Sequence, residues 1–124
     1  MKVSKDSLAI LTVCTSLASG GNKVNPLTIK QWHLLQSSLE RNAMVPEDLF
    51  NISREDMKIK LSYDDKLIDR LSYLLELSGK LSYEIDTLNS KGIECLTIAE
   101  AEYPEKYKIK LGDSAPPVLF YSGK

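Results

Sequence analysis

The amino-acid sequence predicts a mainly helical protein with a short two-stranded β element near its C-terminal end. Apolar residues recur at helical spacing through most of the first three quarters of the chain, which is typical of amphipathic helices. The last quarter instead holds two short apolar runs bounded by glycine and proline, which is typical of strands. A chain of 124 residues and 13.9 kDa is long enough to bury one hydrophobic core. We therefore expect a helical domain over residues 1–92 and a strand–helix–strand segment over residues 93–124.

About five or six helices are expected, and several begin or end at a recognisable residue. The helical segments cover residues 4–18, 25–42, 46–50, 53–61, 63–78 and 81–89, the third being one short turn. Thr28 is an alternative cap that would start the second segment slightly later, and Ser53 with Asp56 forms a capping box for the fourth. Residues 19–22 read SGGN and are expected to end the first helix rather than hold a phosphate, because no strand precedes them and no GK[ST] follows. Gly79 is expected to separate the last two helices.

The C-terminal segment is expected to pair two strands, at residues 94–98 and 118–121, around a short helix. Gly92 follows a helical pattern at a position where a left-handed residue commonly ends a helix. Pro104 suits the first turn of the short helix, because the amide proton that proline lacks would find no intrahelical partner there. Gly112 and Asp113 are expected to stop that helix, and the tandem prolines that follow favour extended backbone.

The order and spacing of residues 91–124 carry a resemblance to a known family. After KGI comes an apolar strand, then YP, then a leucine–glycine stop, then PPVLFYSG. This arrangement resembles the segment that joins the N-terminal helical domain to the Rossmann-like domain in the DNA-processing protein A (DprA, or Smf) family. The resemblance is strongest over this quarter of the chain and weaker over the helices before it. It implies that the helices form a sterile-alpha-motif-like (SAM-like) or helix-hairpin-helix-like domain.

The resemblance also implies a function. Proteins of the DprA/Smf family bind single-stranded DNA during DNA uptake in natural transformation and load a RecA-type recombinase onto it for recombination. For the helical domain it implies a supporting role in interaction and regulation, with at most auxiliary contact with DNA. In that family the DNA site lies on the Rossmann-like domain and its glycine-rich turn, so we expect that apparatus to lie outside these 124 residues.

One cluster of lysines and tyrosines is the candidate for a direct nucleic-acid contact. A formal net charge of −1 and a pI of about 5.8 give no overall attraction to phosphate, so any contact needs a local patch. The candidate residues are Lys80, Lys91, Tyr103, Lys106, Tyr107, Lys108 and Lys110. Lysines could approach the backbone while a tyrosine stacks on a base. Four acidic residues are mixed into the same stretch (Glu100, Glu102, Glu105 and Asp113), so a plain solvated face is the alternative interpretation.

No set of residues has the spacing of a catalytic or metal site, and we expect neither an enzyme nor a bound cofactor. His33 is the one histidine and is expected at the edge of the core or on the surface, while Trp32 is expected to be a core anchor rather than a stacking platform. Cys14 and Cys95 stand far apart in apolar settings and are expected to be buried, reduced thiols, which fits a cytoplasmic location. No apolar run reaches the roughly 18 residues of a membrane span, so no membrane partner is expected.

The last apolar run is the candidate interface. Val118, Leu119, Phe120 and Tyr121 follow one another, and a strand that is apolar on both faces suits burial on both sides. We expect an exposed strand edge that associates with a further domain of the same polypeptide or with a second copy of the chain. Two other functions stay open. One is a stand-alone helical module for protein interaction. The other is a weak helix-hairpin-helix DNA-binding domain, which would require the lysines to share one surface, although residues 78–80 offer a single glycine where such a hairpin normally has two.

Overall fold

The structure is a computed structural model, and it describes residues 4–15 and 25–122. It confirms the mainly helical fold with one two-stranded antiparallel sheet. In chain order, the helical elements before the sheet are α1 (Lys5–Cys14), α2 (Ile29–Arg41), η1 (Pro46–Phe50), α3 (Arg54–Lys60), α4 (Asp65–Glu76), η2 (Leu77–Lys80) and α5 (Leu81–Ser90). They are followed by β1 (Ile93–Thr97), α6 (Glu105–Leu111), η3 (Gly112–Ser114) and β2 (Val118–Ser122), where η marks a 3-10 helix.

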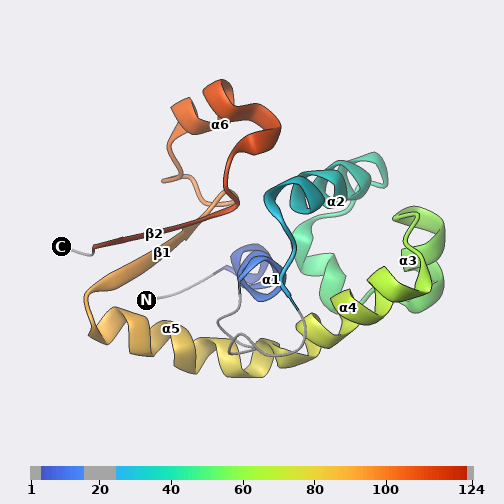
Figure 1. The fold of residues 1–124 in the computed structure, drawn as a ribbon, viewed down its shortest axis with the longest axis horizontal. Helices are drawn as coiled ribbons and strands as arrows, with labels where there is room; N and C mark the ends of the chain where they lie inside the picture. Colours follow the sequence, from blue (N-terminus) through green and yellow to red (C-terminus); the bar gives the residue numbers. More distant parts are fainter. Residues whose placement is uncertain (1–3, 16–24, 123–124) are drawn as a thin grey trace.

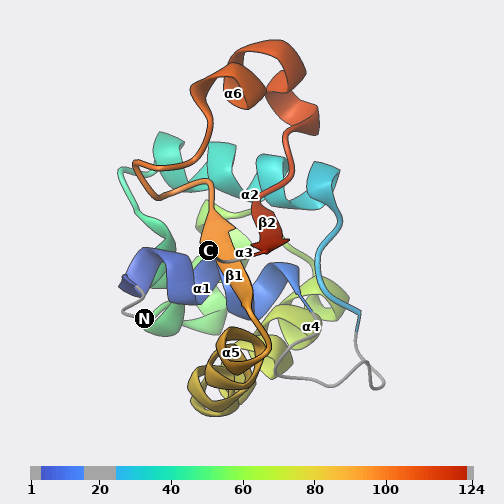
Figure 2. The same ribbon diagram turned by 90° about the vertical axis from the view of Figure 1, so that its left-hand side faces the viewer.

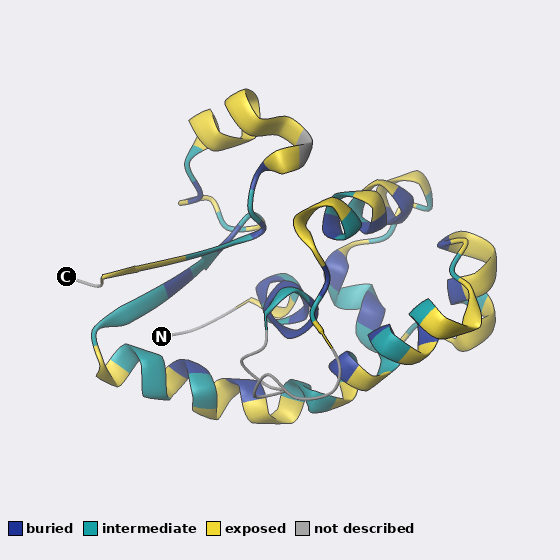
Figure 3. Cartoon of the chain, in the orientation of Figure 1, coloured by how far each residue is buried: buried dark blue, intermediate teal, exposed yellow. Residues whose placement is uncertain are grey.

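Helix α1 is the central element of the fold. It contacts η1, α4, α5 and both strands, and in two perpendicular views it lies between α2 on one side and the α4–α5 pair on the other (Figures 1 and 2). Five consecutive residues, 9–13, are buried, so α1 is enclosed on nearly all sides, as its dark colour in Figure 3 also shows. It ends at Cys14, earlier than expected, because Thr15 has extended backbone. The expected stop at residues 19–22 lies outside the described residues.

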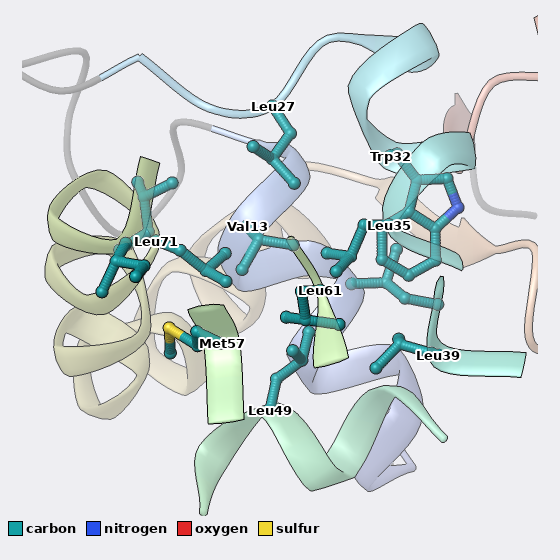
Figure 4. Close-up of a cluster of buried hydrophobic side chains, with 12 residues drawn as sticks. Val13, Leu27, Trp32, Leu35, Leu39, Leu49, Met57, Leu61 and Leu71 are labelled. Atoms are coloured by element: carbon teal, nitrogen blue, oxygen red, sulfur yellow. The ribbon is translucent and has the colours of Figure 1, made fainter. Parts of the chain in front are cut away.

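The larger core cluster is built where α2, η1, α3 and α4 close around α1 (Figure 4). Its buried members are Ile10, Val13, Leu27, Trp32, Leu35, Leu39, Leu49, Met57, Leu61, Ile68, Leu71 and Leu74. Trp32 is confirmed as a core anchor, since 1% of its surface is exposed. Helix α2 takes the later of the two expected starts, because Thr28 caps it and exchanges hydrogen bonds with Gln31 in a full capping box. Ser53 likewise accepts a hydrogen bond from the amide of Asp56 at the start of α3.

The structure differs from the sequence prediction at Gly79. Instead of a turn between two helices, η2 joins α4 to α5, and both helices continue along one curved line (Figure 1). The residues on either side of this segment, Glu76 and Leu81, keep right-handed helical backbone. Leu74 and Leu81 are buried on the two sides of the glycine, and that packing outweighs a helix penalty of about 1 kcal/mol for glycine. The α4–α5 pair is therefore not a helical hairpin.

The C-terminal segment folds back as predicted. Gly92 has a φ of +83° just after α5, which is the left-handed position expected there. Strands β1 and β2 pair antiparallel with Cys95 opposite Phe120, and α6 with η3 forms the connection between them. Pro104 caps α6 rather than occupying its first turn. A second, smaller cluster joins the sheet to α1 and α5, with Leu11, Leu81, Ile85 and Cys95 as its buried members.

Candidate interaction sites

The two faces of the β1–β2 sheet differ in burial. Residues directly opposite each other on antiparallel strands point to the same face, and successive residues alternate between faces. One face carries Cys95 and Thr97, both buried, and it packs on α1 and α5. We call the other the outer sheet face, and it is formed by Glu94, Leu96, Leu119 and Tyr121. All four are half-buried or exposed, so this face lacks the cover that the inner face has.

The four expected interface residues are divided between the two faces: Leu119 and Tyr121 lie on the outer sheet face, whereas Val118 and Phe120 lie on the inner one, opposite Thr97 and Cys95. Val118 packs against both core clusters, and Leu119 is half-buried. Phe120 and Tyr121 are 49% and 48% exposed, although they are large and apolar. Among the described residues, β2 has a strand partner along one edge only, so its other edge keeps free backbone groups. An exposed strand edge of this kind is a ready template for association.

The lysines and tyrosines of the candidate nucleic-acid contact do not form one patch. Helix α6 lies at one end of the molecule, whereas the segment from Lys80 to Lys91 lies at the other, with α1 between them in both views (Figures 1 and 2). Within α6, residues two apart differ by about 200° around the helix axis, so Lys108 points away from Lys106 and Lys110. The arrangement that a helix-hairpin-helix DNA-binding surface would require is therefore not present.

Tyr103 corrects one further expectation, because its ring is not available for stacking on a base. It is 3% exposed, and its hydroxyl donates a hydrogen bond of 2.6 Å to the carbonyl of Pro116. The ring meets Tyr107 edge to face, and the ammonium of Lys108 lies 5.8 Å from its centroid. Burial, together with the nearby Tyr107, raises the pKa of Tyr103 above its usual value. Tyr103 is thus the residue that fixes α6 to the segment before β2.

A cleft between α2 and α6, which we call the α2–α6 cleft, was not anticipated from the sequence. Its volume is about 500 Å³, and segments far apart in the chain line it. Its polar lining residues are Asp6 on α1, His33, Gln36, Ser37 and Glu40 on α2, and Lys108 on α6. Its apolar walls are Ile10, Trp32, Val45, Pro46, Ile98 and Ala99. Trp32, Gln36 and Glu40 follow at intervals of four, which places them on one side of α2.

Two polar atoms of the cleft residues are buried without a partner among the described residues. They are the indole Nε1 of Trp32 and the side-chain oxygen Oε1 of Gln36. The amide nitrogen of Gln36, in contrast, donates a hydrogen bond of 3.1 Å to a carboxylate oxygen of Glu40. Figure 4 shows the indole nitrogen on the side of the ring that faces away from the other labelled core side chains. Buried polar groups are almost always paired, so two unpartnered atoms on residues that line one cleft are unusual.

Two hydrogen-bonded contacts hold the walls of the cleft in place. On one side, Nε2 of His33 lies 2.8 Å from the carbonyl oxygen of Ala115. A carbonyl can only accept, so this nitrogen carries the proton and donates. On the other side, Ser7 on α1 donates to the carboxylate of Glu100 and lies 2.6 Å from the hydroxyl of Thr97. His33 thus takes a structural position at the edge of the core, as expected.

The described residues contain no group of three or more histidine, cysteine, aspartate and glutamate side chains that could hold a metal ion. Cys14 and Cys95 are both free, and burial raises the pKa of each thiol, with Glu94 adding to the rise at Cys95. No helix in the part of the chain that the structure describes is both long and apolar enough to cross a membrane.

Comparison with known proteins gives no relative from which a function could be transferred. No protein-family model matches the chain, no curated protein matches its sequence, and no solved structure matches its fold. The resemblance of residues 91–124 to the DprA/Smf family therefore stays a prediction from the sequence.

Proposed function

We propose that this chain is the N-terminal helical region of a DprA/Smf-like DNA-processing protein and acts there as a non-enzymatic docking domain. The observation that carries the proposal is the β1–α6–β2 unit, whose last strand exposes Phe120 and Tyr121 beside an outer sheet face with little cover. The proposal also rests on the order of motifs in residues 91–124, which resembles the segment that leads into the Rossmann-like domain in that family.

The physical case for docking comes from the small size of the sheet. Two strands alone are marginally stable in water, and a small sheet gains stability by packing on helices or by adding strands. Here one face packs on α1 and α5, and the other keeps Leu96, Leu119 and Tyr121 at least partly in solvent. A further domain that covered this face would bury those side chains and satisfy the free edge of β2.

The proposed role in DNA handling is indirect. In this proposal, binding of single-stranded DNA and loading of a RecA-type recombinase belong to the whole protein in the cytoplasm, and the helical region supports and regulates them. The divergent lysines of α6 and the distance between α6 and the segment from Lys80 to Lys91 favour at most an auxiliary DNA contact by this region. The even mixture of acidic and basic residues points the same way.

A chimera tests the docking role. Residues 1–124 would replace the helical region of a characterised DprA protein, joined to that protein's Rossmann-like domain. We expect one cooperative unfolding transition and retained binding of single-stranded DNA. Changing Leu119 and Tyr121 to Asp should separate the transition into two, whereas Tyr83→Asp should not, because Tyr83 is 73% exposed on α5 and belongs to neither core cluster. Two independent transitions in the unsubstituted chimera would contradict the proposal.

A titration tests the indirect role in DNA binding. Fluorescence anisotropy of a labelled single-stranded oligonucleotide with this 124-residue chain, at low and at moderate salt, should give weak binding or none. Saturable, salt-sensitive binding that is lost when Lys106, Lys108 and Lys110 are changed to Glu would replace the docking role with a DNA-binding one.

The free edge of β2 also supports a second candidate, a stand-alone interaction module that pairs with another copy of itself. Sedimentation of the 124-residue chain separates the two. A dimer that dissociates on changing Phe120 and Tyr121 to Ser favours the stand-alone module, and a monomer at all concentrations favours docking to another domain.

A further inference from the structure

The α2–α6 cleft combines features that a ligand would complete. The indole nitrogen of Trp32 can only donate a hydrogen bond, and the side-chain oxygen of Gln36 can only accept one. Both atoms are buried without a partner among the described residues, and Trp32 itself is 1% exposed. Leaving buried polar groups unpaired costs stability, and a ligand that brings one acceptor and one donor would remove that cost. We propose that the α2–α6 cleft binds a peptide segment that carries a basic side chain.

A peptide group matches the inner part of the cleft. It presents one carbonyl acceptor and one amide donor, which are the partners that Trp32 and Gln36 lack. No charge is required at this depth, which agrees with the neutral character of both side chains. The cleft volume of about 500 Å³ lies within the range of roughly 300–1,000 Å³ that is typical of ligand sites.

The charges around the cleft favour a basic side chain. Two carboxylates, those of Asp6 and Glu40, line the cleft, whereas the cleft residues include one ammonium, that of Lys108. Lys108 is already placed against the ring of Tyr103, and His33 uses its Nε2 on the carbonyl of Ala115. Glu40 is exposed, and its carboxylate receives one hydrogen bond, from Gln36, so it can also accept from a cation. A guanidinium or ammonium would meet these carboxylates while its peptide group occupied the inner part.

The same charges argue against a nucleobase. A base edge also offers a donor beside an acceptor, but it is attached to phosphate, which the two carboxylates would repel. This proposal does not rest on the proposed docking role of the sheet, because the cleft and the outer sheet face share no residue.

Trp32 provides a direct assay, because it is the one tryptophan in the chain. The 124-residue protein would be titrated, with indole emission as the signal, against the blocked tripeptide acetyl-Gly-Arg-Gly-amide. The matched probes are acetyl-Gly-Glu-Gly-amide and thymidine monophosphate. We expect a saturable change with the arginine peptide, at least tenfold weaker binding of the glutamate peptide, and no saturation with the nucleotide.

Two substitutions of buried, unpartnered amides separate binding from folding. Gln36→Leu removes the acceptor in the cleft, and Asn89→Leu removes the unpartnered side-chain oxygen of Asn89 on α5, which does not line the cleft. Both proteins should stay folded with nearly unchanged thermal midpoints, because each change removes an unpartnered oxygen, and the hydrogen bond that Gln36→Leu also removes goes to an exposed carboxylate, that of Glu40. Gln36→Leu should weaken binding of the arginine peptide at least tenfold, and Asn89→Leu should leave the affinity for this peptide unchanged. Glu40→Gln should weaken it by two- to fivefold, since Glu40 is exposed.

Several results would overturn the proposal. A folded protein whose emission does not respond to any probe would mean that the cleft does not bind a peptide. Equal binding of the two peptides would remove the basic preference, and saturation by the nucleotide alone would assign the cleft to a nucleobase. Unchanged affinity in Gln36→Leu would show that the peptide binds elsewhere.

Discussion

The hydrogen-bonded contact between α1 and the end of β1 should contribute a measurable share of stability. Ser7 is buried at 1% exposure and Thr97 at 2%, and their hydroxyls lie 2.6 Å apart. Because Ser7 donates to the carboxylate of Glu100, Thr97 must donate to Ser7, and the amide of Ala99 in turn donates to Thr97. Ser4 adds a second donor to Glu100 at 3.0 Å. The carboxylate also lies at the N-terminal end of α1, where the helix dipole favours a negative charge.

Ser7→Ala removes the central member of this chain of hydrogen bonds. The bond from Ser7 to a carboxylate contributes about 1.5–3 kcal/mol, and leaving the Thr97 hydroxyl buried without an acceptor costs a further 1–3 kcal/mol or so. We therefore expect Ser7→Ala to lower the free energy of unfolding by about 2.5–6 kcal/mol. Thr97→Val keeps the shape and should cost about 1–2 kcal/mol. Urea denaturation at neutral pH measures both, and Ser82→Ala on the exposed side of α5 is the control, with a change within about 0.5 kcal/mol.

The double variant decides whether the reasoning holds. When Ser7→Ala and Thr97→Val are combined, no hydroxyl is left unpaired, so the loss should be smaller than the sum of the single losses by about 1 kcal/mol or more. Losses that add within about 0.3–0.5 kcal/mol would show that the two hydroxyls are not coupled and would refute the predicted contact.

Three further outcomes are expected. Gly92→Ala should lower the free energy of unfolding by about 1–2 kcal/mol in urea denaturation, because Gly92 has a φ of +83°, whereas Gly79→Ala should be neutral or stabilising. Burial raises the pKa of Tyr63 from 10.0 to about 12. The stability that comes from burying the neutral phenol of Tyr63 should therefore be complete below pH ~10 and be lost as the pH rises toward ~12. Urea denaturation across this pH range should show the loss in the unsubstituted protein and not in Tyr63→Phe. At pH ~8 the thiols of Cys14 and Cys95 should react with an aromatic disulfide reagent at least about tenfold more slowly in the native protein than in urea, since burial raises the pKa of both.

The helices could be predicted because their signals are local. Thr28 and Ser53 carry capping side chains, and the apolar spacing in α2 and α4 identifies the buried side of each helix. The strands could be predicted for the same reason, since glycine and proline bound two short apolar runs. Gly79 is the counter-example. Its local preference for a break is real but small, and burial of the leucines around it decides the outcome.

The sites depend on contacts that no local pattern contains. Tyr103 was predicted to be a stacking residue because it lies among lysines, but its burial depends on Pro116, thirteen residues away in the sequence. The bond between Ser7 and Glu100 joins residues 93 apart, and the cleft joins α1, α2 and α6. The one signal in the sequence was the interval of four between Trp32 and Gln36, which places a tryptophan and an amide on the same side of α2.

Helix α6 lines the α2–α6 cleft and leads, through η3, into strand β2, so the contacts that hold it bear on both proposed sites. It has no buried residue, and Ile109 is 75% exposed, so little apolar burial stabilises its seven residues. A helix this short is not stable alone. Its position must come from the segments at its two ends, where Tyr103 and Ala115 are buried and hydrogen-bonded to Pro116 and His33. The residues that fix the ends of α6 therefore also shape the α2–α6 cleft, since His33 lines the cleft and holds Ala115 beyond η3.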